Sequence, residues 1–265
     1  MSISDGVLAN AANFNAAFES KNKTVVSKTG DYTATSSDYQ INCDASGGSF
    51  TITLPAAASN SGLILSIKKT DSSLANSVTI DGNSSETING STTRVLRTQY
   101  EEIHLICNGT SWDILSRYIP LTWTSFTPTV TTSSGTMTNY TATGSWMRIG
   151  GLMYGRFAIT FSGAAGTWTD PLIAIPSSLT YDTTNLRLGG NGASEFGHAS
   201  YEDTGTQSYF GSVQWFSSNR MLMTARNTGG SWSSQGQVAS TTPFSFASGD
   251  SLVGCFLIPI NGWEG

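Results

Sequence analysis

The pattern of hydrophobic and polar positions changes its period near residue 23. Before that point, apolar side chains recur at spacings of four, three and four residues, at Val7, Ala11, Phe14 and Phe18. These spacings place them on one stripe of a helix, and they also match the seam of a coiled coil. A helix this short is marginal alone, so its stripe must pack either on its own domain or in a bundle between identical chains. The pattern predicts a helix over residues 1–22.

The next region, residues 23–118, alternates with a period of two, which is typical of strands buried on one face. Its apolar segments are short and rich in β-branched residues, as in 39–43, 50–54, 63–68 and 103–107. Turn signals separate the segments, at Gly47-Gly48, Asp81-Gly82, Asn89-Gly90 and Asn108-Gly109. We therefore expect an antiparallel β-sandwich or barrel here, with Pro120 suited to a linker.

The last region, residues 119–265, repeats the strand pattern with larger aromatic side chains. Residues 153–161 alternate throughout, and 209–216 and 220–224 predict further strands. The apolar stretch 251–260 favours a strand buried on both faces, or one that a neighbouring subunit partly covers. We expect a jelly-roll-like C-terminal domain. The fold class is then all-β: a short N-terminal helix followed by two antiparallel β-sandwich or jelly-roll-like domains.

The charge of the chain narrows the possible partners. Charged residues make up 12% of the chain, the formal net charge is -5, and no basic cluster is longer than Lys68-Lys69. Such a chain has no basic surface for a phosphate backbone, so we expect no nucleic-acid partner. Its apolar runs are shorter than the ~20 residues of a membrane span, and the N-terminus lacks a secretory signal. We expect no membrane insertion, and synthesis in a cytoplasm.

Cysteine and histidine give no pattern of catalysis or metal binding. Cys43, Cys107 and Cys255 are odd in number and widely spaced, and we expect them to be small buried apolar residues. His104 lies in an alternating strand, on the face opposite to its neighbours, and His198 lies in a Gly-rich stretch that predicts a loop. The sequence predicts no metal site and no cofactor.

Paired acids also fail to form a recognisable catalytic pattern. Glu101-Glu102 and Glu202-Asp203 are adjacent in sequence, and neighbours in a strand point to opposite faces. We expect these four carboxylates at a solvated rim. No catalytic residue is predicted.

Aromatic residues of the C-terminal region are the candidate ligand contacts. Trp168 and Trp232 lie in runs of Gly, Ser and Thr that cannot bury them by local strand packing, whereas Trp215 lies in an apolar strand and is expected in the core. Tyr201 and Tyr209 complete the set of candidates. Such side chains contact a ligand or a neighbouring chain, or else pack under their own loop.

The first β region resembles a module that is widespread in bacteriophage tail fibres. The resemblance covers residues 24–116 and is carried by the order of the segments 24–27 (TVVS), 32–39 (YTATSSDY), 51–57 (TITLPAA), 78–82 (VTIDG), 86–90 (ETING) and 106–114 (ICNGTSWDI). Residues 8–15 (LANAANFN) are similar to the start of many fibre proteins that attach to a virion. The C-terminal region resembles fibre tips in composition and strand pattern only.

This resemblance implies a homotrimeric virion protein, either a tail fibre or a receptor-binding protein, made in the host cytoplasm. Residues 1–22 would attach it to other virion proteins and join the trimer, residues 23–118 would form the fibre module, and residues 119–265 would bind a host surface glycan or protein. It implies no enzyme and no cofactor. The alternatives are a head fibre or decoration protein, a carbohydrate-binding module, and a polysaccharide depolymerase, although the long repeats of a β-helix depolymerase are not seen.

Overall fold

A computed structural model describes residues 24–186, 195–226 and 235–263. Within these ranges the chain forms strands β1 to β19 and a 3-10 helix, Ala57–Ser59, so the prediction of an all-β fold is confirmed. No helix in this part of the chain is long and apolar enough to span a membrane. The predicted helix over 1–22, with Val7, Ala11, Phe14 and Phe18, lies outside the described residues. The chain divides into two compact units, unit 1 (Met1–Pro120) and unit 2 (Leu121–Gly265).

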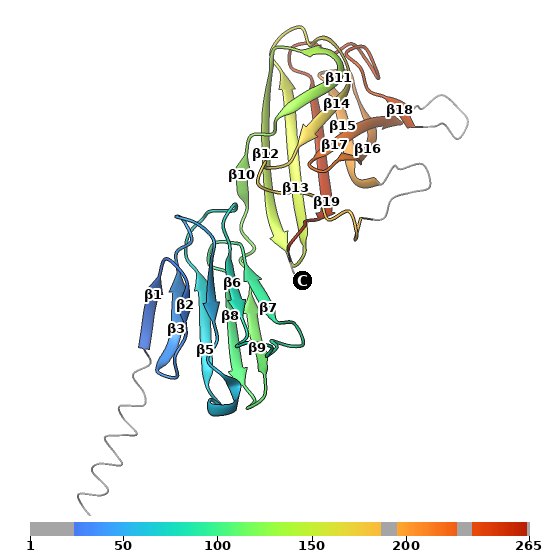
Figure 1. The fold of residues 1–265 in the computed structure, drawn as a ribbon. Coiled ribbons are helices and arrows are strands. Elements are labelled where there is room, and N and C mark those ends of the chain that lie inside the picture. Colours follow the sequence, from blue (N-terminus) through green and yellow to red (C-terminus); the bar gives the residue numbers. More distant parts are fainter. Residues whose placement is uncertain (1–23, 187–194, 227–234, 264–265) are drawn as a thin grey trace, which may run out of the picture. The chain divides into compact units, whose positions relative to one another are not determined.

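Unit 1 consists of two sheets (Figure 1). The strand order is β1-β3-β5-β8-β9 in one sheet and β2-β4-β6-β7 in the other. The strands are β1 (Thr24–Lys28), β2 (Tyr32–Thr33), β3 (Asp38–Cys43), β4 (Phe50–Thr53), β5 (Ile64–Lys69), β6 (Val78–Asp81), β7 (Thr93–Leu96), β8 (Glu102–Cys107) and β9 (Trp112–Tyr118).

The first six strands of unit 1 alternate between these sheets. β1, β3 and β5 pair in parallel, and so do β2, β4 and β6, so the chain winds as a short two-sheet coil. β7, β8 and β9 then close the coil with antiparallel pairing. The expected antiparallel sandwich is therefore wrong for the first six strands. Gly47-Gly48 does not close a hairpin, because it connects β3 and β4, which belong to different sheets.

The core of unit 1 lies between the two sheets. Ile41, Ile67 and Ile103 are cross-strand neighbours in one sheet, Ile52 and Ile80 are neighbours in the other, and all five are fully buried. Each such side chain contributes about 1.5–3 kcal/mol when it is removed from water. Alternation along each strand therefore supplies the apolar layer that holds the sheets together.

Glu101 and Glu102 point to opposite faces, as adjacent residues near a strand must, but Glu101 is not at a solvated rim. Its carboxylate is fully buried and accepts hydrogen bonds from Arg117 Nη2 at 2.7 Å and from the backbone N–H groups of Arg97 and Thr98. A buried carboxylate is tolerated only when it is paired in this way. Glu101 thus ties the turn between β7 and β8 to β9.

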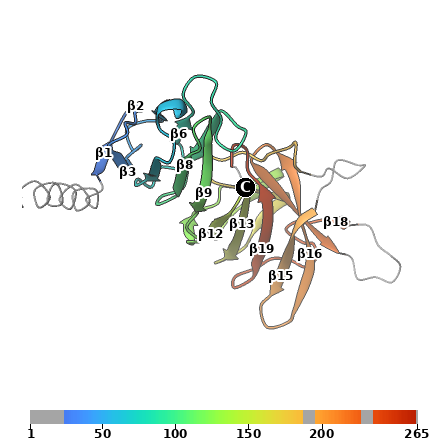
Figure 2. The ribbon, with the colours of Figure 1, turned by 90° about the horizontal axis from the view of Figure 1, so that it is seen from below.

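Unit 2 is one antiparallel sheet with the order β10-β12-β13-β19-β15-β16-β17-β14-β11, and β18 pairs with β17. The expected jelly roll would have two separate sheets, whereas the strands of unit 2 belong to one sheet. The strands are β10 (Thr124–Phe126), β11 (Val130–Met137), β12 (Tyr140–Ile149), β13 (Leu152–Phe161), β14 (Gly166–Ala174), β15 (Glu195–Asp203), β16 (Gln207–Ser217), β17 (Arg220–Arg226), β18 (Gln235–Gln237) and β19 (Ser251–Pro259). Figure 2 shows β13, β19, β15 and β16 side by side.

The sheet of unit 2 must curl strongly. Its edge strands β10 and β11 are consecutive in the chain and are joined only by residues 127–129. A flat sheet of this order would separate them by roughly 40 Å, at about 4.8 Å per strand. The connection spans at most about 14 Å, so the sheet bends round until its edges approach each other. One face of the sheet becomes an enclosed interior and the other becomes the outside.

β19 shows the two faces most clearly. Leu252, Phe256 and Ile258 alternate into the interior and are buried, whereas Val253 and Leu257 point outward and are exposed. Within this chain the strand is therefore covered on one side only. The expectation that β19 is buried on both faces is not met by unit 2 alone.

Candidate functional site

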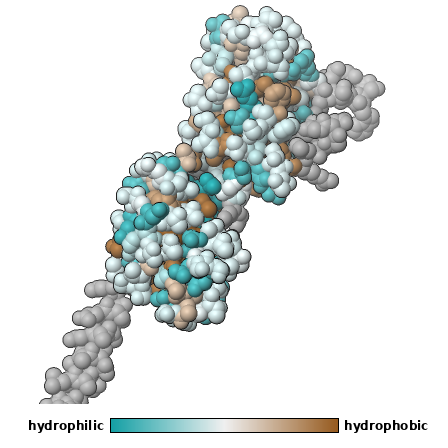
Figure 3. Space-filling view, in the orientation of Figure 1, coloured by the Kyte–Doolittle hydropathy of each residue, from teal (hydrophilic) through white to brown (hydrophobic). Residues whose placement is uncertain are grey.

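The candidate site lies on the outer face, which we define as the side of strands β10, β12, β13, β19 and β15 that points away from the interior of unit 2. The large apolar side chains that are exposed there include Trp123 (43%), Tyr154 (36%), Val253 (37%) and Leu257 (45%). Figure 3 shows apolar side chains gathered in patches on a mostly white surface of unit 2. Exposed aromatic groups at this density mark an interaction surface.

The register of the strands sets which side chains meet on this face. Tyr154 of β13 lies opposite Leu257 of β19, and Arg156 lies opposite Cys255. Cys255 in turn lies opposite His198 of β15. This part of the outer face is thus built from three neighbouring strands, β13, β19 and β15, and its side chains are held by the sheet.

A first hollow, with a volume of about 460 Å³, opens beside Trp123. The Trp123 ring lies 5.6 Å from the Tyr154 ring, and the Arg156 guanidinium lies 4.7 Å from the centre of Trp123. Arg156 Nε donates a hydrogen bond to Ser145 Oγ at 3.0 Å. The other lining residues are Ser125, Thr143, Gly144, Phe157, Ala158 and Val253. The first hollow therefore combines the Trp123 ring, hydroxyl groups and one cation, and Tyr154 packs against Trp123 without lining it.

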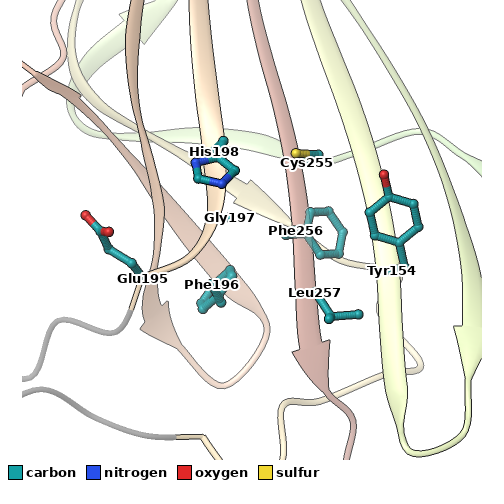
Figure 4. Close-up of a pocket in the computed structure, with 8 residues that line it drawn as sticks. All are labelled: Tyr154, Glu195, Phe196, Gly197, His198, Cys255, Phe256 and Leu257. Atoms are coloured by element: carbon teal, nitrogen blue, oxygen red, sulfur yellow. The ribbon is translucent and has the colours of Figure 1, made fainter.

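A second hollow, of about 360 Å³, lies on the other side of Tyr154 (Figure 4). His198, Cys255 and Tyr154 stand side by side on β15, β19 and β13, with Glu195 and Phe196 at one end. The prediction that His198 lies in a loop is wrong, because it belongs to β15. Cys255 is a free thiol that is only half-buried, unlike Cys43 and Cys107, which are buried as predicted.

The ionisable side chains that line the two hollows are Tyr154, Arg156, Glu195, His198 and Cys255. Glu195 is the single carboxylate that lines either of them in the described part of the chain. The structure records no hydrogen bond between His198 and Cys255 within the same ranges, so this pair lacks the contact by which a base activates a nucleophile. No group of three or more His, Cys, Asp or Glu side chains in residues 24–186, 195–226 and 235–263 is placed to hold a metal ion.

Glu202 adds a negative charge to the outer side of β15. The hydroxyl groups of Ser200 and Ser208 donate to its carboxylate, and these hydrogen bonds lower its pKa. The carboxylate is therefore ionised at neutral pH. Glu202 is two residues after Ser200 in β15 and is the cross-strand partner of Ser251 in β19. It does not line either hollow.

Trp168, a predicted ligand contact, lies in the interior instead. It is buried, its indole N–H donates to the carbonyl of Ala165 at 3.0 Å, and its ring stacks on Phe161 and packs against Phe246. The Gly-rich run before it bends back, so the strand that follows carries Trp168 inward. Because Trp168 is buried, it cannot contact a ligand at the surface of unit 2.

Tyr201 is likewise buried, and its hydroxyl donates to the carbonyl of Thr224 at 2.9 Å. Burial raises the pKa of Tyr201 and leaves its side chain without access to a ligand at the surface. Tyr209 is half-buried, stacks on Phe244 and lines a separate hollow with Arg226 and Pro243. Tyr209 remains a candidate contact, and Trp232 lies outside the described residues.

Sequence reasoning missed Trp123, Tyr154 and Arg156. The alternation over 153–161 does carry the signal for two of them, because Met153, Gly155 and Phe157 face inward and leave Tyr154 and Arg156 on the other side. No pattern in the sequence shows that Trp123, from a different segment, lies against this strand. Only the pairing of β10 with β12 and of β12 with β13 brings it there.

Comparison with known proteins gives little more. No family model and no curated protein matches the chain. Among solved structures it is similar to the Dettilon tailspike protein, with 12% sequence identity and a TM-score of 0.41. The alignment covers 90% of this chain and 46% of the tailspike chain, so this chain spans about half the length of that protein.

Proposed function

We propose that the chain is a structural component of a bacteriophage particle, a trimeric tail fibre or receptor-binding protein that contacts the host surface through unit 2. The observation that carries the proposal is the exposed outer face with Trp123, Tyr154, Val253 and Leu257. A soluble monomer rarely leaves such a face open, and an attachment protein needs one. The resemblance of residues 24–116 to a fibre module supports the same function.

In this proposal each part of the chain has a separate function. The N-terminal residues join other virion proteins, and unit 1 is a spacer whose core is complete in itself. Unit 2 carries the recognition surface. Three copies then present three such surfaces together, which raises weak affinities by avidity.

Binding is favoured over catalysis because hydrolysis of a polysaccharide normally uses two facing carboxylates. In the described residues the two hollows of the outer face share one carboxylate, Glu195. A side chain that stacks, such as Trp123, and one that forms charge-assisted hydrogen bonds, such as Arg156, serve recognition instead.

The test is to purify phage particles from a lysate that contains this chain and to label them with an antibody against unit 2. We expect the label at the tail, and we expect purified chain to compete with particles for adsorption to host cells. Label at the head would support the head fibre or decoration protein instead. Absence of the chain from purified particles would disprove the proposal. Release of reducing ends from host capsule by the purified chain would favour a depolymerase.

A further inference from the structure

We propose that the first hollow, beside Trp123, binds an acidic sugar, with the sugar ring on the Trp123 side chain and its carboxylate on Arg156. This inference rests on the proposed function and deepens it, because it names the class of ligand and the residues that hold it. Three features of the hollow carry it: an aromatic platform, an oriented cation and a rim of hydroxyl groups.

The aromatic platform is the Trp123 ring, which lines the hollow and packs against the Tyr154 ring beside it. The two rings are 5.6 Å apart and inclined at 56°, so they form two sides of an angle rather than a closed stack. Both rings stay exposed, which leaves apolar surface for the C–H face of a sugar. Because Trp123 directly precedes β10 and Tyr154 lies in β13 of the same sheet, the platform is formed before the ligand arrives.

The cation is Arg156. Its Nε bonds to Ser145 Oγ at 3.0 Å and its guanidinium lies against Trp123, so the side chain is already oriented. In the part of the chain that the structure describes, no carboxylate forms an ion pair with it. The terminal N–H groups of an arginine form the fork that matches a carboxylate with two hydrogen bonds. An unpaired, oriented arginine beside an aromatic platform points to an anionic ligand.

The rim supplies hydroxyl groups. Ser125, Thr143 and Ser145 lie around the hollow, above a floor that includes Ala158 and Val253. A hydroxyl donates and accepts hydrogen bonds and so suits the hydroxyl groups of a sugar. The volume of about 460 Å³ lies within the range of small-molecule sites, which is roughly 300–1,000 Å³.

A second copy of this chain is the competing occupant. An apolar face between subunits would not require an arginine without an acidic partner, because burying such a charge is costly. The more apolar part of the outer face, around Leu257, suits a neighbouring chain better. We therefore assign the first hollow to the ligand.

The experiment measures binding of methyl glucuronide and methyl glucoside, which differ in the carboxylate, to the full chain by saturation-transfer NMR and titration. We expect the wild-type chain to bind the glucuronide about tenfold more tightly than the glucoside. Arg156→Gln should remove this preference and keep weak binding of both sugars. Trp123→Ala should lose binding of both, and Tyr118→Ala, which removes an exposed aromatic group of unit 1, should change neither.

Three outcomes would overturn the inference: equal binding of the two sugars by the wild-type chain, an unchanged preference in Arg156→Gln, or a change of oligomeric mass in Trp123→Ala without a change in sugar binding. Adsorption of the purified chain to host cells separates this inference from the proposed function. Adsorption without glucuronide binding would defeat only the acidic-sugar site. Failure to adsorb and absence from particles would defeat the proposed function itself.

Discussion

In the interior of unit 2, phenylalanine rings lie across glycines of the neighbouring strand. Phe256 is the cross-strand partner of Gly155, and Phe157 is the partner of Gly254. A Cβ atom added at Gly155 would lie 2.2 Å from Phe256 Cζ, and one at Gly254 would lie 2.4 Å from Phe157 Cζ. The two rings occupy the space that a side chain at Gly155 or Gly254 would fill, so the packing of the interior depends on these two glycines.

Gly155→Ala should therefore destabilise unit 2 by about 1–3 kcal/mol, the usual cost of forcing extra atoms into a packed interior. Urea unfolding followed by circular dichroism measures the change. Gly47→Ala is the control, because an added Cβ there meets no atom within 4 Å. Equal stability of Gly155→Ala and wild type would show that Phe256 moves aside at no cost.

The interactions of Asp71 make the stability of unit 1 depend on pH. Burial raises the pKa of its carboxyl, but the hydrogen bond from Lys69 and those from the backbone N–H groups of Ala45 and Ser73 outweigh burial and hold the pKa below the usual 3.8. Lys69 Nζ lies 2.6 Å from Asp71 and is fully buried. A carboxyl with a lowered pKa stabilises the fold above the unfolded value and loses that contribution as pH falls through the folded value.

Asp71→Asn should cost about 3 kcal/mol at pH 7, because Lys69 keeps a buried charge without its partner. The difference from wild type should narrow at pH 2.5, which lies below the ordinary pKa of 3.8, because the contribution of a carboxyl with a lowered pKa declines as pH falls below the unfolded value. Urea midpoints at the two pH values measure this. Asp113→Asn, on an exposed carboxylate, should show little difference at either pH. A constant difference for Asp71→Asn would rule out the ion pair as its cause.

For single residues, the sequence shows which chemical groups are available, but it is less informative about where the fold places them. The polarity of a local run suggested that Trp168 is at the surface, but it is buried against Phe161, at the end of the preceding strand, and against Phe246, from a distant segment. Trp123 shows the reverse case, since only strand pairing reveals its contact with Tyr154. Contacts between remote segments decided both outcomes, and local pattern carries no information on them.

Strand patterns predicted the elements of unit 1 better than their arrangement. The segments 39–43, 50–54 and 103–107 match β3, β4 and β8 closely. Alternation depends on one buried face, which a parallel and an antiparallel neighbour provide equally. The direction of pairing was therefore open, and the parallel coil of β1 to β6 could not be derived from alternation.

The antiparallel strands that close this coil are held by the buried pair Glu101–Arg117, with its 2.7 Å contact. Arg117→Met should destabilise unit 1 by roughly 3–5 kcal/mol, because Glu101 keeps its buried charge without the partner. Hydrogen exchange should rise first in β8 and β9. The double variant Glu101→Leu with Arg117→Met should recover part of the loss. Unchanged exchange in β8 and β9 of Arg117→Met would contradict this role.

At the scale of the whole molecule, the two units differ in how complete they are. The apolar core of unit 1 is enclosed by its own two sheets. Unit 2 fills its interior as well, yet it also exposes Leu257 on β19, whose sequence is apolar on both faces. A strand that carries apolar residues on its exposed side is best explained by a partner that covers it in the assembled protein.

The proposed trimer makes this partner a second copy of the chain. Sedimentation equilibrium of the purified chain should give three times the chain mass of 28.0 kDa. Leu257→Lys should lower the mass toward 28.0 kDa with an unchanged circular dichroism spectrum, because a lysine charge buried between subunits lacks a partner. Leu115→Lys, on the exposed side of β9 in unit 1, is the matched control and should leave the mass unchanged. A wild-type mass of 28.0 kDa would contradict the trimer, and a trimeric Leu257→Lys would place the contact between copies away from β19.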